Sequence, residues 1–413
     1  RTPTNILEEW AQLSGLSDFT GSALQDSFAA VEQRISVNTE NSVHNQQNQL
    51  LFDGMKKLGY HADSLRRNAV GCEQRCGTCG FGCRYGCKQS TTKTYLQDAY
   101  EHGARIVVRC SADKVLLEGG KAVGVVASVT DQETGKTSSV TVRAKTVVVA
   151  AGAINSPALL LRSGLTNPHI GRHLHLHPVS TISARYPDKV YSWRGVMQSA
   201  YSDEFGNLDG NYGYKVEVPP SHPGLIGLTN PWYSALSYRE QMAQAAYIGT
   251  FIVLTRDKGE GTITLDRHGE PVVDYVTSVY DRRHLLHGLR VSARAHFAAG
   301  ATEIYSLHNK RTSLARSQDG TVSEQQLRVF DAQLERHGMD VNRLMVFSAH
   351  QMGTCRMGAH SQQAVTDGNC EVHGVKGLFV CDGSVFPAAS GVNPMLSIMG
   401  LAHRASQYIK TIA

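Results

Sequence analysis

The chain has 413 residues, of which 41% are hydrophobic and 19% are charged, and its formal net charge at pH 7 is +5. This length suits two domains or one interleaved pair, and the composition is that of a globular protein. The mild charge, without a run of Lys or Arg, argues against a nucleic-acid partner, and no apolar stretch is long enough to span a bilayer.

The first part of the chain is expected to be helical and then to form a cysteine-rich loop. Residues 1–66 carry helix start and stop signals, among them Asn41 or Ser42 as a cap and Gly59 as a stop. Residues 71–87 are rich in glycine and cysteine, which favours a loop.

The next elements change from helix to strand. A helix is expected over residues 90–103, and short strands split by a Gly-Gly turn over residues 104–130. An apolar strand over 146–150 then meets a tight turn of small residues, and a helix follows from about Ser156 to Gly164. Strand, tight turn and helix is the order found in a dinucleotide-binding layer.

The second half of the chain has a different pattern. Residues 261–275 predict a hairpin, residues 281–300 predict a helix, and mixed strands and helices over 180–345 suggest an antiparallel substrate-binding sheet. The chain ends with a strand and loop over 377–391 and a terminal helix, which repeats the strand, turn and helix order of the earlier half.

Two polar residues in the last part of the chain, His350 and Asn393, are candidate functional residues. His350 lies two residues before a compact Met-Gly-Thr-Cys turn in "SAHQMGTCRMG". Asn393 and Pro394 are a favoured cap and first residue of a helix, whose N-terminus carries free N–H groups and a partial positive charge. A bound flavin would suit that helix end, because its N1–C2=O edge becomes negative on reduction.

Three motifs follow one another along the chain: "AAGAINSPALLLRSG", "HQMGTCRMG" and "VCDGSVFPAASGVNPMLSIMGLAHR". Together they resemble the glucose–methanol–choline (GMC) oxidoreductase family, a group of FAD enzymes that oxidise alcohols. The resemblance covers nearly the whole chain. "CGFGCRYGCKQSTTKTYLQDA" and "IGRHLHLHP" look most similar to the long-chain (fatty) alcohol oxidase branch.

The resemblance implies a role for each matching residue. His350 corresponds to the active-site base of the family, and Asn393 stands where the family has a second polar residue, His or Asn. Asp382 and Gly383 match a loop beside the ribityl and pyrophosphate part of the flavin. The cofactor-binding residues implied in this way are Ser90, Thr91, Val115, Ala151, Gly152, Asp382, Gly383, Asn393, Pro394 and Met395.

The fold class expected is mixed, α+β or α/β, with an incomplete FAD-binding Rossmann-like domain interleaved with an antiparallel-sheet substrate-binding domain. We expect the chain to divide into a helical segment with the cysteine-rich loop (1–87), the first part of the FAD-binding domain (88–178), the substrate-binding domain (179–344) and the C-terminal part of the FAD-binding domain (345–413).

The G-x-G-x-x-G turn that opens the FAD-binding domain of the family is not found. The nearest match, "GFGCRYG" over 80–86, follows a cysteine-rich loop rather than an apolar strand, so it is not a nucleotide-binding turn. We therefore expect the chain to be the C-terminal part of a longer enzyme and to bind FAD poorly alone.

The expected reaction is oxidation of a primary, long-chain aliphatic alcohol to an aldehyde. His350 as a neutral imidazole would take the hydroxyl proton, Asn393 would donate its amide to the oxygen, and a hydride would pass to FAD. Oxygen or another electron acceptor would then reoxidise the flavin. The cysteine pattern favours a reducing compartment, hence a cytoplasmic location. A long-chain aliphatic substrate is also compatible with peripheral membrane contact.

The cysteines carry two alternative hypotheses. Closely spaced thiolates can wrap around a metal or an iron–sulfur cluster, which would make the protein an FAD and iron–sulfur dehydrogenase of a sugar or sterol, or a non-catalytic metal-binding fragment. The residues concerned are Cys72, Cys76, Cys79, Cys83 and Cys87. The plainer interpretation is a packed, reduced loop. A zinc site at His173, His175 and His177 on one strand face is a weaker hypothesis.

Overall fold

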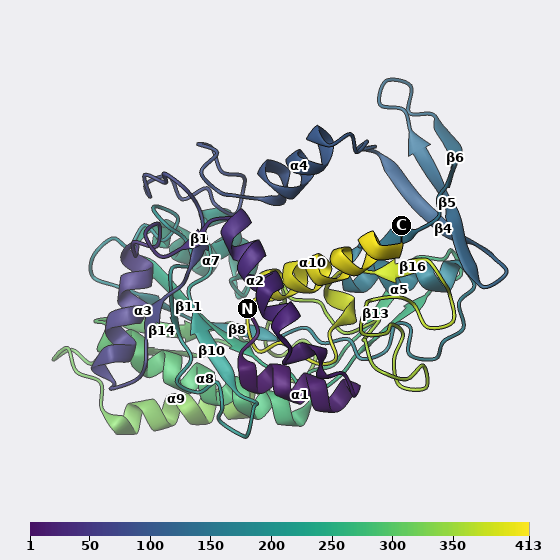
Figure 1. The fold of residues 1–413 in the computed structure, drawn as a ribbon. Coiled ribbons are helices and arrows are strands. Elements are labelled where there is room, and N and C mark those ends of the chain that lie inside the picture. The colour runs from purple at the N-terminus through teal and green to yellow at the C-terminus, as the bar shows by residue number, and fades with distance from the viewer. Residues whose placement is uncertain (413) are drawn as a thin grey trace.

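The computed structural model describes residues 1–412. The chain forms two units that lie side by side (Figure 1). One contains a seven-stranded sheet with long helices against it, and the other contains smaller sheets around two helices. The mixed fold class expected from the sequence is confirmed.

The seven-stranded sheet is antiparallel throughout. Its central strands come from residues far apart in the chain, and every residue of β11 is buried. In spatial order the strands are β15 (Ser313–Ala315), β14 (Glu303–Ser306), β8 (Val179–Arg185), β11 (Ile248–Thr255), β10 (Tyr214–Glu217), β9 (Ala200–Ser202) and β2 (Asp63–Ser64).

Helix α8 (Val279–Ala298) covers one face of this sheet, and α3 (Gln46–Lys57) and α9 (Glu324–His337) pack beside it. Helix α8 lies close to strand β11, because a Cβ on Gly288 would lie 2.3 Å from Val253 Cγ1. Side chains alternate along a strand. Tyr214 and Val216 of β10 therefore face the α8 core, and Glu217 faces the opposite side.

The second unit contains an antiparallel meander and a short parallel pair. The meander is β4 (Cys110–Glu118), β5 (Lys121–Thr130) and β6 (Thr137–Arg143), and the expected Gly-Gly turn joins its first two strands. In the parallel pair, β7 (Val147–Val149) lies against β16 (Leu378–Val380), although more than 200 residues separate them in the chain. Helices α5 (Gly152–Arg162) and α10 (Met395–Ile412) pack around this pair.

The N-terminal segment is shared between the two units. Helices α1 (Thr4–Ser14) and α2 (Ser22–Arg34) belong to the core of the second unit, where a Cβ on Gly400 of α10 would lie 2.4 Å from the Phe28 ring. Helix α3 belongs to the core of the seven-stranded sheet. The three N-terminal helices are therefore divided between the two cores.

Three expected helix starts are corrected by the structure. Asn45, rather than Asn41 or Ser42, caps α3, because its Oδ1 accepts from the Asn48 N–H (3.0 Å). The helix expected over 90–103 is divided into η2 (Thr91–Lys93) and α4 (Tyr95–Glu101), because Thr94 leaves helical backbone angles. Helix α5 starts at Gly152, four residues before the expected Ser156.

The remaining elements connect these units. They are η1 (Ser17–Phe19), β1 (Val37–Asn38), β3 (Arg67–Asn68), α6 (Pro223–Thr229), α7 (Ala235–Ala243), η3 (Ala245–Tyr247), the expected hairpin of β12 (Thr262–Leu265) and β13 (Pro271–Asp274), and η4 (Gly383–Val385). Within residues 1–412, no helix has both the length and the apolar composition needed to cross a bilayer.

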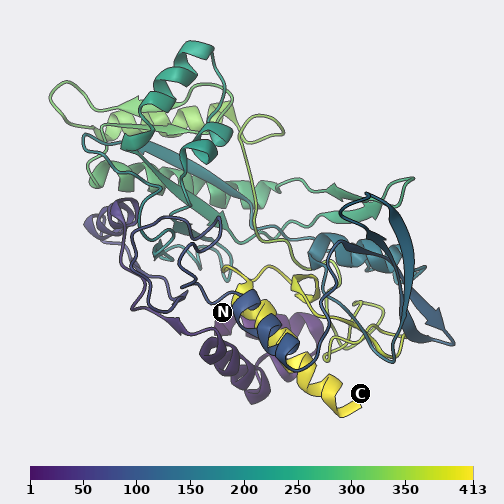
Figure 2. The ribbon, with the colours of Figure 1, turned by 90° about the horizontal axis from the view of Figure 1, so that it is seen from above.

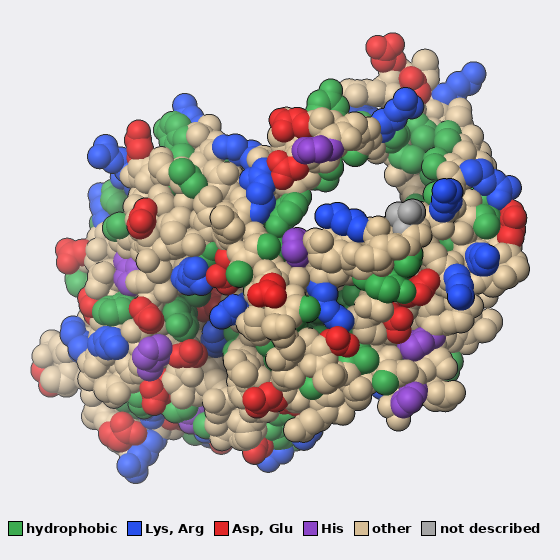
Figure 3. Space-filling model, in the orientation of Figure 1, with side chains coloured by type: hydrophobic (Ala, Val, Ile, Leu, Met, Phe, Trp, Pro, Cys, Tyr) green, Lys and Arg blue, Asp and Glu red, His purple; other side chains and the backbone are tan. Residues whose placement is uncertain are grey.

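The space-filling view shows an opening between the α4 segment, the β4–β6 meander and α10 (Figure 3). In the view from above, α4 lies in front of α10 (Figure 2). The opening therefore lies between these two helices. Ile106, Val107 and Val108, in the link between α4 and β4, expose more than half of their surface. Apolar side chains exposed in a row usually mark a surface that binds something.

Buried histidines in the core predict loss of stability in acid. His296 of α8 accepts a hydrogen bond from Tyr186 Oη at Nδ1 and donates from Nε2 to the Ile182 carbonyl, so it is held neutral. Burial lowers its pKa from 6.5 to about 3, against the weaker effect of the Ile182 carbonyl. The unfolded chain binds a proton there below pH 6.5 and the folded chain does not, so stability falls as the pH drops.

We expect His296 to cost the protein about 2 kcal/mol of unfolding free energy between pH 7 and pH 5. Chemical denaturation at several pH values measures this. In His296→Gln the slope of stability against pH should be shallower over that range. An unchanged slope would contradict the assignment.

Candidate active site

Two segments that are far apart in the sequence cross at the junction of the two units. Residues 173–179 run antiparallel to residues 347–352, with hydrogen bonds from the His175 N–H to the Met352 carbonyl (2.9 Å) and from the Phe347 N–H to the Val179 carbonyl (3.0 Å). This crossing brings the predicted catalytic residue His350 against His177.

The two imidazoles form a pair. Their Nδ1 atoms are 3.1 Å apart and their rings are nearly perpendicular, at 89°. The backbone N–H of Gly391 donates to Nε2 of His177 (3.0 Å), and Asn393 follows two residues later. Three segments of the chain therefore meet at this histidine pair.

Burial keeps this histidine pair neutral. Burial lowers the pKa of His350 from 6.5 to about 4, although the Asp257 carboxylate acts in the opposite direction. Burial, and then the neighbouring His350, lower the pKa of His177 to about 3. Both rings are uncharged at pH 7, which agrees with the neutral imidazole expected from the sequence.

A buried carboxylate holds the loop on which His177 lies. Asp257 accepts hydrogen bonds from the backbone N–H groups of Leu176 (2.8 Å) and His177 (3.0 Å) and from Tyr275 Oη (3.0 Å). Burial by itself raises the pKa of Asp257, but His175, His177 and these hydrogen bonds outweigh it and hold the pKa below its usual value. Both carboxylate oxygens of Asp257 therefore accept hydrogen bonds.

Asn393 has a partner that the sequence did not indicate. Its Nδ2 donates to Oε2 of Glu217 (3.2 Å), which also accepts from Gln198 Nε2 (2.7 Å). Glu217 is 0% exposed and lies on the face of the sheet opposite α8. The amide of Asn393 is thus oriented by a buried carboxylate at the start of α10.

The residues matched to the flavin loop lie at the carboxyl ends of two adjacent parallel strands. Ala151 and Gly152 follow β7, and Asp382 and Gly383 follow β16. The carboxyl ends of parallel strands form the crevice where α/β folds bind their ligands. This arrangement fits a dinucleotide cofactor.

Asp382 joins these two turns. Its Oδ2 accepts from the Gly152 N–H (2.9 Å) and Ser156 Oγ (2.5 Å), and its Oδ1 accepts from the N–H (2.8 Å) and Oγ (2.5 Å) of Ser384. With all four bonds made inside the protein, its carboxylate positions the backbone of both turns.

The other matched cofactor residues lie on separate elements of the chain. Val115 is buried in β4, and its N–H donates to Ser163 Oγ after α5 (2.8 Å). Met395 begins α10 and is 46% exposed. Ser90 and Thr91 lie at the start of η2, on the α4 side of the opening.

The five clustered cysteines are free thiols that line one small cavity together with Arg67 and Lys88. Across residues 1–412, no three His, Cys, Asp or Glu side chains are arranged to hold a metal ion. The iron–sulfur hypothesis thus has no support from the described part of the chain.

The three alternating histidines do not share a face. His173 and His177 have positive φ angles (63° and 49°), so the regular strand expected for a zinc site does not form. His173 Nδ1 contacts Glu260 Oε2 (2.8 Å), while His175 lies buried between Asp257 and Glu260.

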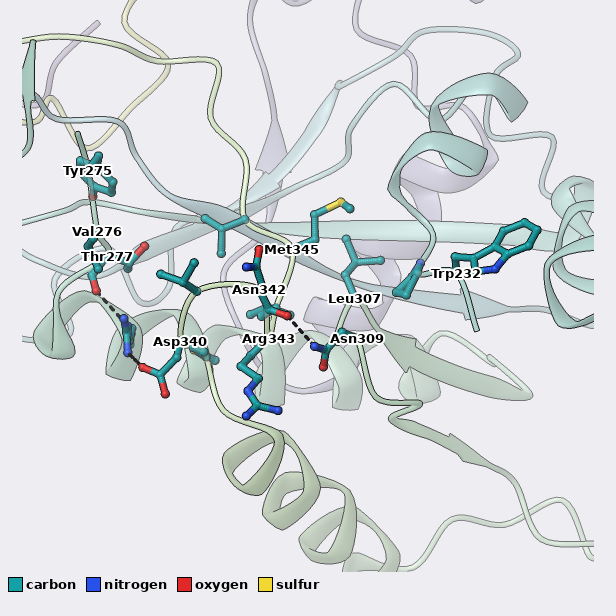
Figure 4. A pocket seen from close by; sticks show the side chains of 16 residues that line it. Trp232, Tyr275, Val276, Thr277, Leu307, Asn309, Asp340, Asn342, Arg343 and Met345 are labelled. Atoms are coloured by element: carbon teal, nitrogen blue, oxygen red, sulfur yellow. Dashed lines mark hydrogen bonds and ion pairs between the residues drawn. The ribbon is translucent and has the colours of Figure 1, made fainter. Parts of the chain in front are cut away.

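A cavity of about 500 Å³ lies on the α8 side of the seven-stranded sheet (Figure 4), and its lining does not include His177, His350 or Asn393. It extends from Tyr275, whose hydroxyl binds Asp257, to Trp232 at the opposite end. Met345 and Val346 line it and lead along the chain to His350. Its apolar lining consists of Pro231, Trp232, Val276, Leu307, Met339, Val341, Leu344, Met345 and Val346.

Sequence reasoning placed His350 and Asn393 in one site but missed their partners. His177 belongs to a repeat of alternating histidines, and nothing else in the sequence marks it as a partner of His350. Glu217 lies in an ordinary strand sequence, and nothing near it marks a functional role.

Comparison with known proteins gives a consistent picture. GMC oxidoreductase family models match residues 1–179 and 257–402. The long-chain-alcohol oxidases FAO4B and FAO3 of Arabidopsis thaliana are 33% and 32% identical, each over 99% of this chain and 56% of their own length. The chain thus spans about half the length of these curated relatives.

Solved structures with a similar fold are more distant in sequence. Pyridoxine 4-oxidase from Mesorbium loti is 19% identical, with a TM-score of 0.62 over 89% of this chain and 70% of its own. A formate oxidase is 14% identical, with a TM-score of 0.60 over 90% of this chain and 72% of its own.

Proposed function

This chain belongs to the GMC oxidoreductase family, and from that premise we propose that the protein oxidises a long-chain primary alcohol to an aldehyde with FAD. The observation that carries the proposal is the contact of His350 with His177, which accepts from the Gly391 N–H two residues before Asn393. Names of relatives at about one-third identity agree with an alcohol substrate.

The residues around the crevice would hold the cofactor. The turns at Ala151–Gly152 and Asp382–Gly383 offer backbone groups, and the N-terminus of α10 at Met395 offers free N–H groups and a partial positive charge. Bound FAD would supply a ring that accepts a hydride from the alcohol carbon. The exposed apolar side chains at 106–108 are of the kind that a large bound group covers.

The chain's own residues would bind and orient the alcohol. The hydroxyl would lie against the open nitrogen of His350 and the amide of Asn393, which Glu217 holds in place. His177 is fully buried and His350 is half-buried, which lowers the effective dielectric around the pair and strengthens hydrogen bonds there. We expect oxygen to be the electron acceptor, as the names of the relatives indicate. The cytoplasmic location and membrane contact stay predictions.

We propose that the cavity of Figure 4, one end of which lies at Tyr275 beside Asp257, takes the long aliphatic chain. Each methylene that it removes from water stabilises binding by about 0.8 kcal/mol. In the FAD-loaded protein, Val276→Asp should therefore raise KM for a sixteen-carbon alcohol about tenfold and leave KM for butanol unchanged.

The matched control is Val329→Asp on α9. Val329 is 50% exposed and Val276 is 54% exposed, but only Val276 lines the cavity. Steady-state kinetics over a series of alcohol lengths makes the comparison. Equal KM values for both variants at every length would place the alkyl chain elsewhere.

A further inference from the structure

The cysteine-rich loop has no part in the alcohol chemistry proposed above. Five of the nine cysteines lie within residues 72–87, and all five are free, half-buried thiols. They line a cavity of only about 20 Å³, which is room for about one water molecule, so the thiols lie close to one another. Two of them, Cys83 and Cys87, differ in the groups that surround their sulfur atoms.

The chain turns back on itself between Cys83 and Cys87. The Gly86 N–H donates to the Cys83 carbonyl (3.0 Å), and Gly86 has a positive φ of 65°, which glycine adopts without strain. The turn brings the two side chains together, and the Cys87 thiol can donate a hydrogen bond to Cys83 Sγ. Two cysteines in contact across a turn can form a disulfide with little movement of the backbone.

Backbone N–H groups point at the sulfur of Cys83, and the Lys88 N–H donates to it (3.3 Å). Burial by itself raises the pKa of Cys83, but the N–H groups of Lys88, Cys87 and Tyr85 outweigh it and hold the pKa below its usual value. Burial and the neighbouring Cys83 instead raise the pKa of Cys87. Cys83 is therefore the thiol that ionises first, and Cys87 keeps its proton.

We propose that Cys83 and Cys87 are a modification site, a pair of thiols that hydrogen peroxide converts to a disulfide. The Cys83 thiolate attacks one peroxide oxygen, the O–O bond breaks, and with one proton taken up the products are a sulfenic acid on Cys83 and water. The sulfur of Cys87 then attacks the sulfenic sulfur. The S–O bond breaks, a second water leaves and the S–S bond forms, so the peroxide gains the two electrons that the thiols lose.

The proposed function supplies the oxidant. When oxygen reoxidises a reduced flavin, two electrons and two protons convert the oxygen to hydrogen peroxide. Only this source of peroxide rests on the proposed function, because the reactivity of the pair depends on the loop itself. The enzyme would therefore modify its own cysteine-rich loop during turnover with oxygen.

A second cysteine pair in the same chain is a matched control. Cys370 and Cys381 form a hydrogen bond with each other, and Cys370 is 2% exposed. The bond to Cys381, and then burial, raise the pKa of Cys370 well above its usual value. A thiol that is protonated and shielded from solvent reacts slowly with peroxide, so this pair should stay reduced.

Peptide mass spectrometry of the full-length, FAD-loaded enzyme tests the proposal. The reduced enzyme is treated with hydrogen peroxide, and the remaining thiols are then alkylated. We expect a peptide in which Cys83 and Cys87 together have lost two hydrogens, while Cys370 is alkylated. Alkylated Cys83 and Cys87 after the treatment, or a disulfide from either of them to another cysteine of the loop, would overturn the proposal.

Two variants separate the roles of the thiols. Cys87→Ser should stop at the sulfenic acid on Cys83, which dimedone traps as an adduct. In Cys83→Ser, the remaining thiol of Cys87 should react with peroxide about tenfold more slowly than Cys83 does in the wild type. Equal rates would contradict the assignment of Cys83 as the thiol that attacks.

Turnover distinguishes this inference from the proposed function. With a long-chain alcohol and oxygen in place of added peroxide, the same disulfide should form, and catalase should prevent it. A disulfide that forms with added peroxide but not with alcohol and oxygen would count against the proposed oxidation and support the reactive pair alone.

Discussion

Replacing His350 with Ala in the full-length, FAD-loaded enzyme should lower kcat for alcohol oxidation by about 10²- to 10⁴-fold, the usual contribution of a residue that handles the reacting proton or oxygen. In the proposed function the imidazole meets the substrate oxygen, and within residues 1–412 its side-chain hydrogen bond is to His177. No matched cofactor residue depends on it, so FAD should remain bound.

Steady-state kinetics and the flavin absorbance of the purified variant measure the two quantities separately. His360→Ala is the matched control, because His360 is an exposed histidine ten residues further along the same segment. It should keep wild-type turnover. Turnover near wild type in His350→Ala would reject the assignment of the site, and loss of FAD would make His350 a structural residue.

Asp382→Ala should destabilise the protein more than any other change to a matched cofactor residue. The carboxylate accepts four hydrogen bonds from Gly152, Ser156 and Ser384, and these donors are largely buried. Removing the acceptor leaves them without a partner, at an expected cost of about 3–5 kcal/mol of unfolding free energy. The two turns of the crevice would also separate, so FAD binding should weaken strongly.

Chemical denaturation gives the stability change, and the FAD retained after gel filtration gives the effect on binding. Asp188→Ala is the control, because Asp188 is an exposed carboxylate in the loop after β8. It should change stability by less than about 0.5 kcal/mol. If Asp382→Ala were as stable as this control, the carboxylate would not join the two turns.

Local elements were predictable because their signals are local. The Gly-Gly turn between β4 and β5, the hairpin of β12 and β13, and helix α8 lie where the sequence indicated. The helix starts were less accurate, because several Asn and Ser residues near α3 compete as caps. The domain boundaries stay predictions, while the division of residues 1–87 between two cores depends on packing that a local pattern does not contain.

In the site, too, the residues in short motifs were predictable and their hydrogen-bond partners from distant segments were not. The order of three motifs was enough to propose that His350, Asn393 and Asp382 act together. Their hydrogen-bond partners come from other segments: His177 lies 173 residues before His350, and Glu217 lies 176 residues before Asn393. A partner at that separation leaves no periodic signal in one sequence.

The sequence by itself determined the family, the mixed fold class and the residues that could carry alcohol chemistry, because these depend on short motifs and on local helix and strand signals. Only the tertiary structure decided which groups those residues contact and how they are charged. Burial lowers the pKa of His350 and His177, and the Gly391 N–H donates a hydrogen bond to His177. These properties arise from desolvation and from hydrogen bonds between distant segments, which exist only once the chain has folded.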